Sequence, residues 1–241
     1  MKEVVGVVDW GIGGLDLFTR LRAPRMVYLS DSGTAPYGRL CAASLLRRFE
    51  VLERALLERG VTRIVVACNT LSTILPLARP RVPTSGVIRP TLAFLNDSNF
   101  SNLAVVGTDR TVASGAYLEA PAVVAQRSIQ PLGALIERGE GTCSRRVRTV
   151  VAEALDGLAC NGLVLGCTHY AAVRAEFERH VATIIDPVDV VLDQLSYATK
   201  TPVRDVWTTG CPATMRRAAH AAFGVRLGPI HVLSDRPEIR P

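Results

Sequence analysis

The segment Ile64-Val65-Val66-Ala67-Cys68-Asn69-Thr70 is the strongest indicator of the fold. A short run of β-branched residues that ends in small polar residues and leads into a helical pattern is typical of a buried parallel strand. The segment Leu163-Val164-Leu165-Gly166-Cys167-Thr168-His169 has the same form later in the chain. The sequence therefore contains a repeated strand that ends in a cysteine.

The repeat extends to an earlier strand in each half of the chain. Val4–Asp9 resembles Leu103–Thr108, and the last residues of these two segments precede Cys68 and Cys167 by the same number of positions. Two halves that share one register indicate two similar α/β units that face each other across a cleft. In open α/β sheets the ligand binds beyond the carboxyl ends of the strands, where the repeat places its polar residues.

Strand-like runs alternate with helical patterns along the rest of the chain, which predicts an α/β fold. We expect two pseudo-symmetric Rossmann-like (flavodoxin-like) domains with mostly parallel sheets and the active site between them. The first would comprise residues 1–88 plus 197–241, and the second residues 89–196. Helices are expected at Ala42–Arg59 and Cys143–Leu158. The expected strands are Val4–Val8, Met26–Leu29, Ile64–Ala67, Ser85–Ile88, Leu103–Val106, Val123–Ala125, Leu163–Leu165 and Thr183–Ile185.

The composition excludes several classes of protein. With 241 residues, 48% hydrophobic and 21% charged, the chain is in the range of globular proteins and outside that of disordered or fibrous ones. No apolar stretch approaches the roughly 18 residues that span a bilayer, so no membrane association is expected. The first residues carry no leader pattern, which predicts a cytoplasmic protein with free thiols. The cysteines are Cys41, Cys68, Cys143, Cys160, Cys167 and Cys211.

The net charge of +6 is compatible with an acidic partner. The arginines are scattered and interleaved with glutamates, as in Arg47–Arg59, which is typical of a solvated helix face. No aromatic and basic platform is present, so nucleic acid is not expected as a partner.

The two repeated cysteines are the best candidates for chemistry. Each precedes a helical pattern, where the helix dipole and free N–H groups favour a thiolate that can act as a base. A single cysteine at such a place would more often be a small buried hydrophobe. The neighbouring pairs Asn69-Thr70 and Thr168-His169 supply donors suited to a carboxylate.

Other uses of these residues are less well supported. Redox chemistry lacks a C-x-x-C motif, and a zinc site built from Cys68, Cys167, His169 and Asp9 lacks the usual close ligand spacing. The stretch Asp9–Gly14 departs from a phosphate-binding G-x-G-x-x-G because Asp16 replaces the third glycine. Neither a metal nor a cofactor is therefore expected.

With these motifs in view, the chain is similar over nearly its whole length to the cofactor-independent aspartate/glutamate racemase family. The Cys-Thr-His-Tyr form of the second cysteine motif resembles the glutamate branch more than the aspartate branch. The matching segments are Asp9-x-Gly11-x-Gly13-Gly14-Leu15, Tyr28–Asp31 followed by Pro36-Tyr37-Gly38, Ala67-Cys68-Asn69-Thr70, Gly86-Val87-Ile88-x-Pro90, Gly107-Thr108 with Thr111 and Ser114, Pro131–Glu137, and Leu165-Gly166-Cys167-Thr168-His169-Tyr170.

The resemblance implies that L- and D-glutamate are interconverted by a two-base mechanism. Cys68 and Cys167 would exchange the α-proton on opposite faces of one carbon, with Asp9 assisting the first cysteine and His169 and Glu137 the second. A small acidic amino acid is the implied ligand, peptidoglycan synthesis the implied pathway, and a homodimer a possible assembly. The implied substrate-binding residues are Trp10, Pro36, Tyr37, Gly38, Asn69, Thr70, Thr111 and Thr168.

Purely structural roles remain open for the three assisting residues. Asp9 would then cap a helix, His169 would be a hydrogen-bonded core residue, and Glu137 would lie on a solvated helix face.

Two positions depart from the family pattern. Trp10 replaces the usual serine, and Arg89 replaces the usual glutamate. An indole only donates a hydrogen bond and is far larger than a hydroxyl. If it points into the cleft, a smaller acid such as aspartate is favoured, or the protein binds a ligand without turnover; if it points away, glutamate racemisation is retained.

Overall fold

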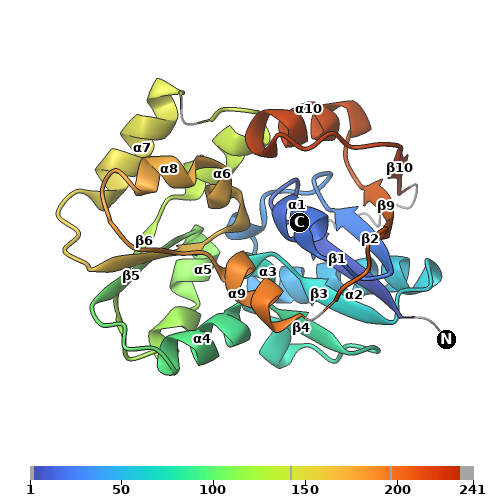
Figure 1. The fold of residues 1–241 in the computed structure, drawn as a ribbon, viewed down its shortest axis with the longest axis horizontal. Coiled ribbons are helices and arrows are strands. Elements are labelled where there is room, and N and C mark those ends of the chain that lie inside the picture. The colour runs from blue at the N-terminus through green and yellow to red at the C-terminus, as the bar shows by residue number, and fades with distance from the viewer. Residues whose placement is uncertain (1–2, 142, 196, 234–241) are drawn as a thin grey trace.

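A six-stranded parallel sheet forms the first unit of the computed structural model, which describes residues 3–141, 143–195 and 197–233 (Figure 1). The strand order is β10-β9-β2-β1-β3-β4. The outer parts of the expected first domain, residues 1–2 and 234–241, lie outside the described residues. The strands are β1 (Val4–Asp9), β2 (Arg25–Ser30), β3 (Arg63–Val66), β4 (Thr84–Gly86), β9 (Val203–Thr208) and β10 (Ile230–Val232).

A four-stranded parallel sheet of order β6-β5-β7-β8 forms the second unit. This order repeats β2-β1-β3-β4 of the first sheet, with β5 in the place of β1 and β7 in the place of β3. The predicted α/β fold of two pseudo-symmetric units with parallel sheets is confirmed. The strands are β5 (Leu103–Gly107), β6 (Val123–Ser128), β7 (Gly162–Gly166) and β8 (Ile184–Ile185).

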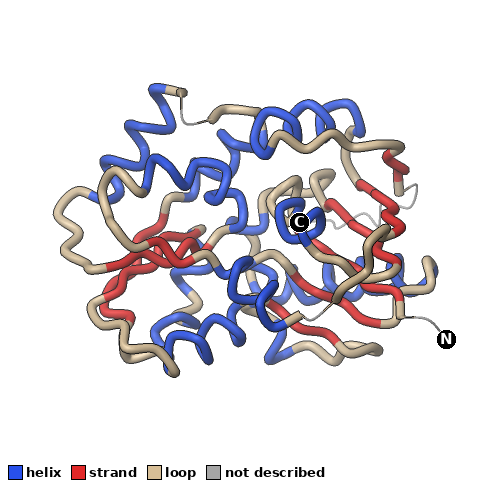
Figure 2. The backbone as a smooth tube through the Cα atoms, in the orientation of Figure 1, coloured by secondary structure: helices blue, strands red, loops and turns tan. Residues whose placement is uncertain are grey.

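Helices cover the faces of both sheets, as the tube in Figure 2 shows. Helix α2 (Ala42–Glu58) illustrates the cause, because Leu45, Phe49, Leu52 and Leu56 recur on one face and are all buried. The other helices are α1 (Leu15–Arg20), α3 (Asn69–Ser72), α4 (Ile88–Asn96), α5 (Asp109–Ala113), α6 (Gln130–Glu137), α7 (Arg145–Leu155), α8 (Arg174–Phe177), α9 (Pro187–Gln194) and α10 (Pro212–Phe223), with short 3-10 turns at Tyr37–Arg39, Leu75–Leu77, Ala116–Glu119 and Thr168–Val173.

One predicted strand extends too far along the sequence. The expected strand Ser85–Ile88 is wrong at its end, because β4 stops at Gly86 and Ile88 already belongs to α4. The N–H group of Val87 donates to the Ser72 hydroxyl at 3.2 Å instead of to a neighbouring strand. The side chain of Ser72 therefore ends the strand.

Two predicted helices are also shorter than expected. Helix α2 ends one residue before Arg59. Helix α7 covers Arg145–Leu155 of the expected 143–158, because the Ser144 hydroxyl caps its first turn by accepting from Val147 N.

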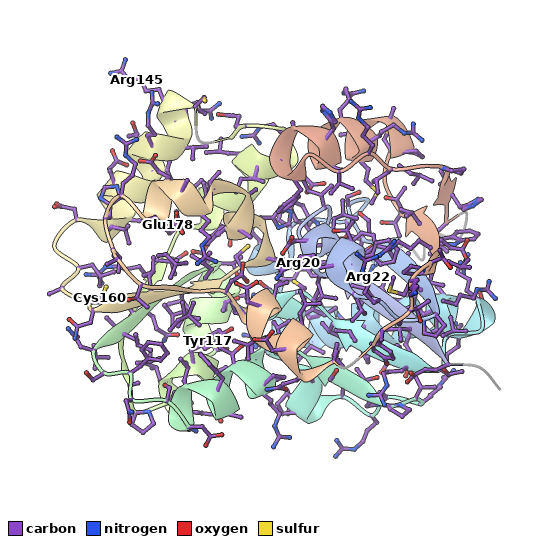
Figure 3. The ribbon with its side chains drawn as sticks, in the orientation of Figure 1. Arg20, Arg22, Tyr117, Arg145, Cys160 and Glu178 are labelled. Carbon is purple, nitrogen blue, oxygen red and sulfur yellow. The ribbon has the colours of Figure 1, made fainter. Side chains whose placement is uncertain are left out.

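Helices also join the two units. Helix α10 packs on α6, and α9 packs on α1, so each contact brings together segments of different units. In Figure 3 Arg20 of α1 lies near this junction, where it pairs with Asp189 of α9 at 2.8 Å. Both side chains are substantially exposed, so this pair adds little stability. Buried apolar side chains of these helices, such as Leu135 of α6 and Ala219 of α10, belong to one hydrophobic cluster that includes residues of both units.

Candidate active site

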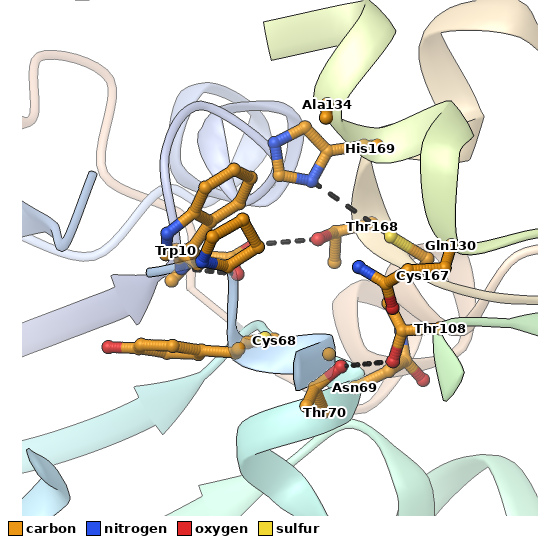
Figure 4. Close-up of a pocket in the computed structure, with 15 residues that line it drawn as sticks. Trp10, Cys68, Asn69, Thr70, Thr108, Gln130, Ala134, Cys167, Thr168 and His169 are labelled. Atoms are coloured by element: carbon orange, nitrogen blue, oxygen red, sulfur yellow. Dashed lines mark hydrogen bonds between the residues drawn. The ribbon is translucent and has the colours of Figure 1, made fainter. Parts of the chain in front are cut away.

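A small cavity lies where the carboxyl ends of the two sheets meet (Figure 4). The space open to the centre of a water molecule is about 30 Å³. Most residues expected from the sequence line it: Asp9, Trp10, Pro36, Tyr37, Gly38, Cys68, Asn69 and Thr70 from the first unit, and Cys167, Thr168 and His169 from the second. Two expected residues, Thr111 and Glu137, are outside this lining and contact it through other side chains.

The strand order explains why these residues converge. The chain connections reverse direction between β1 and β3 in the first sheet and between β5 and β7 in the second. Asp9 ends β1 and Cys68 follows β3, whereas Thr108 and Cys167 follow β5 and β7. Such a reversal opens a crevice beyond the strand ends, and here two crevices face each other.

Cys68 lies at the N-cap of α3 and is buried. Its sulfur accepts a weak hydrogen bond from Leu71 N at 3.5 Å. Burial raises the pKa of the Cys68 thiol well above its ordinary value, and the negative charge of Asp9 raises it further. The thiol is therefore a weak acid, and its thiolate is a correspondingly strong base.

Asp9 is completely buried and links the two units. Its Oδ1 accepts from Trp10 N at 2.7 Å, and its Oδ2 accepts from the Thr168 hydroxyl at 2.7 Å. Burial raises the pKa of the Asp9 carboxyl, although His169 and the Thr168 hydrogen bond act in the opposite direction. The carboxyl accepts a hydrogen bond from a neighbouring main-chain N–H but caps no helix, since α1 begins at Leu15 with Gly14 as its N-cap.

Cys167 lies beside an imidazole and a carboxylate. His169 Nδ1 is 4.0 Å from Cys167 Sγ, and His169 Nε2 donates to Glu137 Oε2 at 2.9 Å. Burial opposes protonation of His169, but its hydrogen bonds to Cys167 and Glu137 outweigh burial and raise its pKa well above 6.5. Glu137 also accepts from Ile12 N at 3.0 Å, so it is held from both units.

Hydroxyl groups from both units form the edge of the cavity that lies opposite His169 (Figure 4). Thr70 Oγ1 is 2.7 Å from Thr108 Oγ1 and 3.1 Å from Thr111 Oγ1. Asn69 Oδ1 accepts from Tyr117 at 2.5 Å, whereas Asn69 Nδ2 is buried and has no hydrogen-bond partner among the described residues. A buried amide without a partner is costly, and a ligand oxygen would satisfy it.

Trp10 points into the cavity. The indole centroid is 5.6 Å from that of His169, and the indole N–H donates to the Thr34 carbonyl at 3.2 Å. Of the two orientations considered from the sequence, the structure has the one that narrows the cleft.

Further lining residues were missed by the sequence analysis: Thr108, Gln130, Gly133 and Ala134. Thr108 is the counterpart of Asp9 in the repeat, so the repeat itself contained a signal for it. Gln130 follows β6 without any motif, and only folding brings it against Gly38.

Two further findings concern metals and membranes. Within residues 3–141, 143–195 and 197–233, no group of three or more His, Cys, Asp or Glu side chains is arranged to hold a metal ion. In the same ranges, no helix has the length and apolar character needed to cross a bilayer.

The fold and the site define a two-unit α/β protein in which a cysteine from each unit lines one small cavity together with ionisable side chains. The chain belongs to the Asp/Glu/hydantoin racemase family, whose sequence model matches residues 26–195. The resemblance noted from the sequence motifs is therefore confirmed, and with it the class of amino-acid racemases.

Individual relatives agree with this family assignment. A glutamate racemase from Pseudomonas paraeruginosa is 31% identical over 248 residues, covering 91% of this chain and 94% of the relative. One from Limosilactobacillus reuteri is 27% identical over 213 residues, covering 82% and 79%. The crystal structure of glutamate racemase from Thermus thermophilus in complex with β-chloro-D-alanine is similar with a TM-score of 0.85 and 26% identity, covering 97% of each chain.

Proposed function

We propose that this protein is a cofactor-independent racemase that inverts an acidic α-amino acid through Cys68 and Cys167. On similarity alone, glutamate is the first candidate substrate, because the similar proteins are glutamate racemases. The observation that carries the proposal is that the two cysteines come from different units, line the same cavity and have separate acid–base partners.

The chemistry requires a base and an acid on opposite faces of one carbon. Cys68 is flanked by Asp9, and Cys167 by His169, so each thiol has an ionisable side chain beside it. The α-proton of an amino acid is weakly acidic, and the raised pKa of Cys68 makes its thiolate a stronger base toward that proton. His169, whose pKa is raised, places its Nδ1 4.0 Å from the sulfur of Cys167.

The hydrogen-bond donors at the cavity edge opposite His169, which are Asn69, Thr70 and Thr108, suit a substrate carboxylate. Asn69 Nδ2 lacks a partner among the described residues, and Asn69, Thr70 and Thr108 all belong to the cavity lining. Fixed donors in a cavity with little room for water also stabilise the charge that develops when the α-proton leaves. These residues therefore hold the carboxylate while the thiols act on the α-carbon.

Aspartate is the second candidate substrate, because Trp10 takes up space inside the cavity. A protein that binds a small acid without turnover is the remaining alternative. The same experiment separates all three.

The test is exchange of the α-proton with solvent. The protein is incubated in D₂O with L- and D-glutamate and with L- and D-aspartate, and the α-proton signal is followed by NMR. We expect loss of the signal and appearance of the opposite enantiomer for at least one of the two pairs. Absence of exchange for all four compounds would contradict the proposed activity.

A further inference from the structure

Trp10 is the largest side chain in the cavity lining, and its position is fixed by three contacts. Its main-chain N–H donates to Asp9 Oδ1 at 2.7 Å. Its indole N–H donates to the Thr34 carbonyl at 3.2 Å, and its ring packs against His169. Rotation of the indole out of the cavity would break the last two contacts.

The acceptor of the indole N–H is itself anchored to the protein core. Thr34 donates from its hydroxyl to Asp31 Oδ2 at 3.1 Å. Asp31 is completely buried and paired with Arg48, whose side chain is only 2% exposed. The same Asp31 oxygen accepts from the Tyr37 hydroxyl at 2.5 Å, so one buried ion pair fixes two neighbouring parts of the cavity wall.

The indole N–H group of Trp10 is already hydrogen-bonded within the protein, and this determines which contacts Trp10 can make with a ligand. An indole has one polar hydrogen, and here that hydrogen is used by Thr34. The ring therefore presents only an apolar surface to the cavity, and about 30 Å³ remains open to the centre of a water molecule. Compared with a serine at this position, the indole leaves a long polar side chain of a ligand less space and no hydrogen-bond partner at this wall.

We propose that Trp10 sets the length of the substrate side chain, so that the protein prefers α-amino acids with a side chain no longer than that of aspartate over glutamate. This inference rests on the proposed racemase function and names the substrate class of that site. Removal of one methylene group from a ligand changes selectivity by about 10-fold to 200-fold in known enzymes, which is the size of effect expected here.

The first experiment compares kcat/KM for aspartate and glutamate in the wild-type protein, Trp10→Ser and Trp10→Phe. Alanine and serine are included as still shorter substrates. We expect the wild type to prefer the short substrates, Trp10→Ser to shift the ratio toward glutamate by at least about tenfold, and Trp10→Phe to keep most of the wild-type preference. Trp207→Phe is the matched control, because this second tryptophan stacks on His231 in the outer part of the sheet and is outside the lining.

A binding measurement supports the kinetic one and does not require turnover. The chain has two tryptophans, so in Trp207→Phe the fluorescence comes from Trp10 alone. We expect aspartate to change this emission at lower concentration than glutamate.

The possible outcomes distinguish the proposed role of Trp10 from the proposed racemase activity. An unchanged aspartate-to-glutamate ratio in Trp10→Ser, or a wild type that turns over glutamate at least as well as aspartate, would overturn the role of Trp10 while leaving racemase activity intact. Exchange with none of the amino acids in any variant would overturn both. If Trp10→Ser does not fold, the wild-type preference and the emission of Trp10 in Trp207→Phe decide the question.

Discussion

Glu137 acts on the cavity only through the side chains that it contacts. It is outside the lining, its side chain is 13% exposed, and it accepts from both His169 and Ile12. A solvated helix position, which the sequence left open, does not describe this carboxylate. Its charge instead helps to keep His169 protonated, because the Glu137 hydrogen bond raises the pKa of the imidazole.

Replacement of Glu137 by Gln should therefore change the pH dependence of activity. The amide oxygen can still accept from Ile12 N, but the negative charge beside His169 is lost. We expect a lower pKa for His169, so the part of the pH profile that requires its protonated form moves to lower pH, and racemase activity on the alkaline side of the profile falls. Steady-state kinetics between pH 6 and 9 measure this effect.

Glu178→Gln provides the matched control for this substitution. Glu178 pairs with Arg174 on the surface and is 47% exposed, so its variant should have the wild-type profile. A Glu137→Gln profile identical to that of the wild type would show that the carboxylate has no influence on the site.

At the scale of elements, helix α9 begins with a buried acid. Asp186 caps the helix by accepting from Val188 N at 2.9 Å and is only 6% exposed. Burial, together with the negative charges of Asp189 and Asp16, raises its pKa to about 6, although the Val188 hydrogen bond and Arg174 act in the opposite direction. The folded state therefore binds more protons than the unfolded state between about pH 4 and pH 6.

This difference predicts how stability depends on pH. The contribution of Asp186 to the stability of the folded state is most favourable below its ordinary pKa of 3.8. This contribution decreases as the pH rises through about 6. Asp186→Asn keeps an oxygen that can cap α9 but removes the charge. We expect the variant to be more stable than the wild type at pH 8, on the order of 2 kcal/mol, and to lose this advantage near pH 4. Urea unfolding at the two pH values measures the difference.

Asp186→Ala separates capping from charge, since it removes both. It should be less stable than Asp186→Asn at every pH, by about 1 kcal/mol for the lost cap. An Asn variant that is less stable than the wild type at pH 8 would contradict the unfavourable burial of the carboxylate.

The secondary structure could be predicted where the pattern was local. The central strands and α2 have uninterrupted apolar runs or a clear helical period, and they formed as expected. Strands β9 and β10 were missed, because β9 contains Arg204 and Asp205 next to apolar residues and resembles no buried strand. Only the pairing of β9 with β2, far away in the sequence, and of β10 with β9 makes them part of the sheet.

At the scale of the whole molecule, the internal repeat predicted the site better than any single residue did. Matching strand ends place Cys68 and Cys167 in equivalent positions of the two halves. Contacts between the units, such as Thr168 with Asp9 and Thr70 with Thr108, join residues far apart in the chain and carry no local signal. The direction of Trp10 depends on the Thr34 carbonyl and was equally invisible in the sequence.

The symmetry of the molecule leads to the central claim, that inversion needs one thiol from each half. The most direct measurement is racemisation, by circular dichroism or chiral chromatography, in Cys68→Ser and in Cys167→Ser, started from each enantiomer of the substrate that exchanges. Cys41→Ser is the control, because Cys41 is exposed at the N-cap of α2 and outside the cavity lining. We predict that each cavity variant loses at least about 10²-fold in racemisation from both enantiomers, while the control keeps the wild-type rate. Wild-type racemisation by either cavity variant would contradict the account.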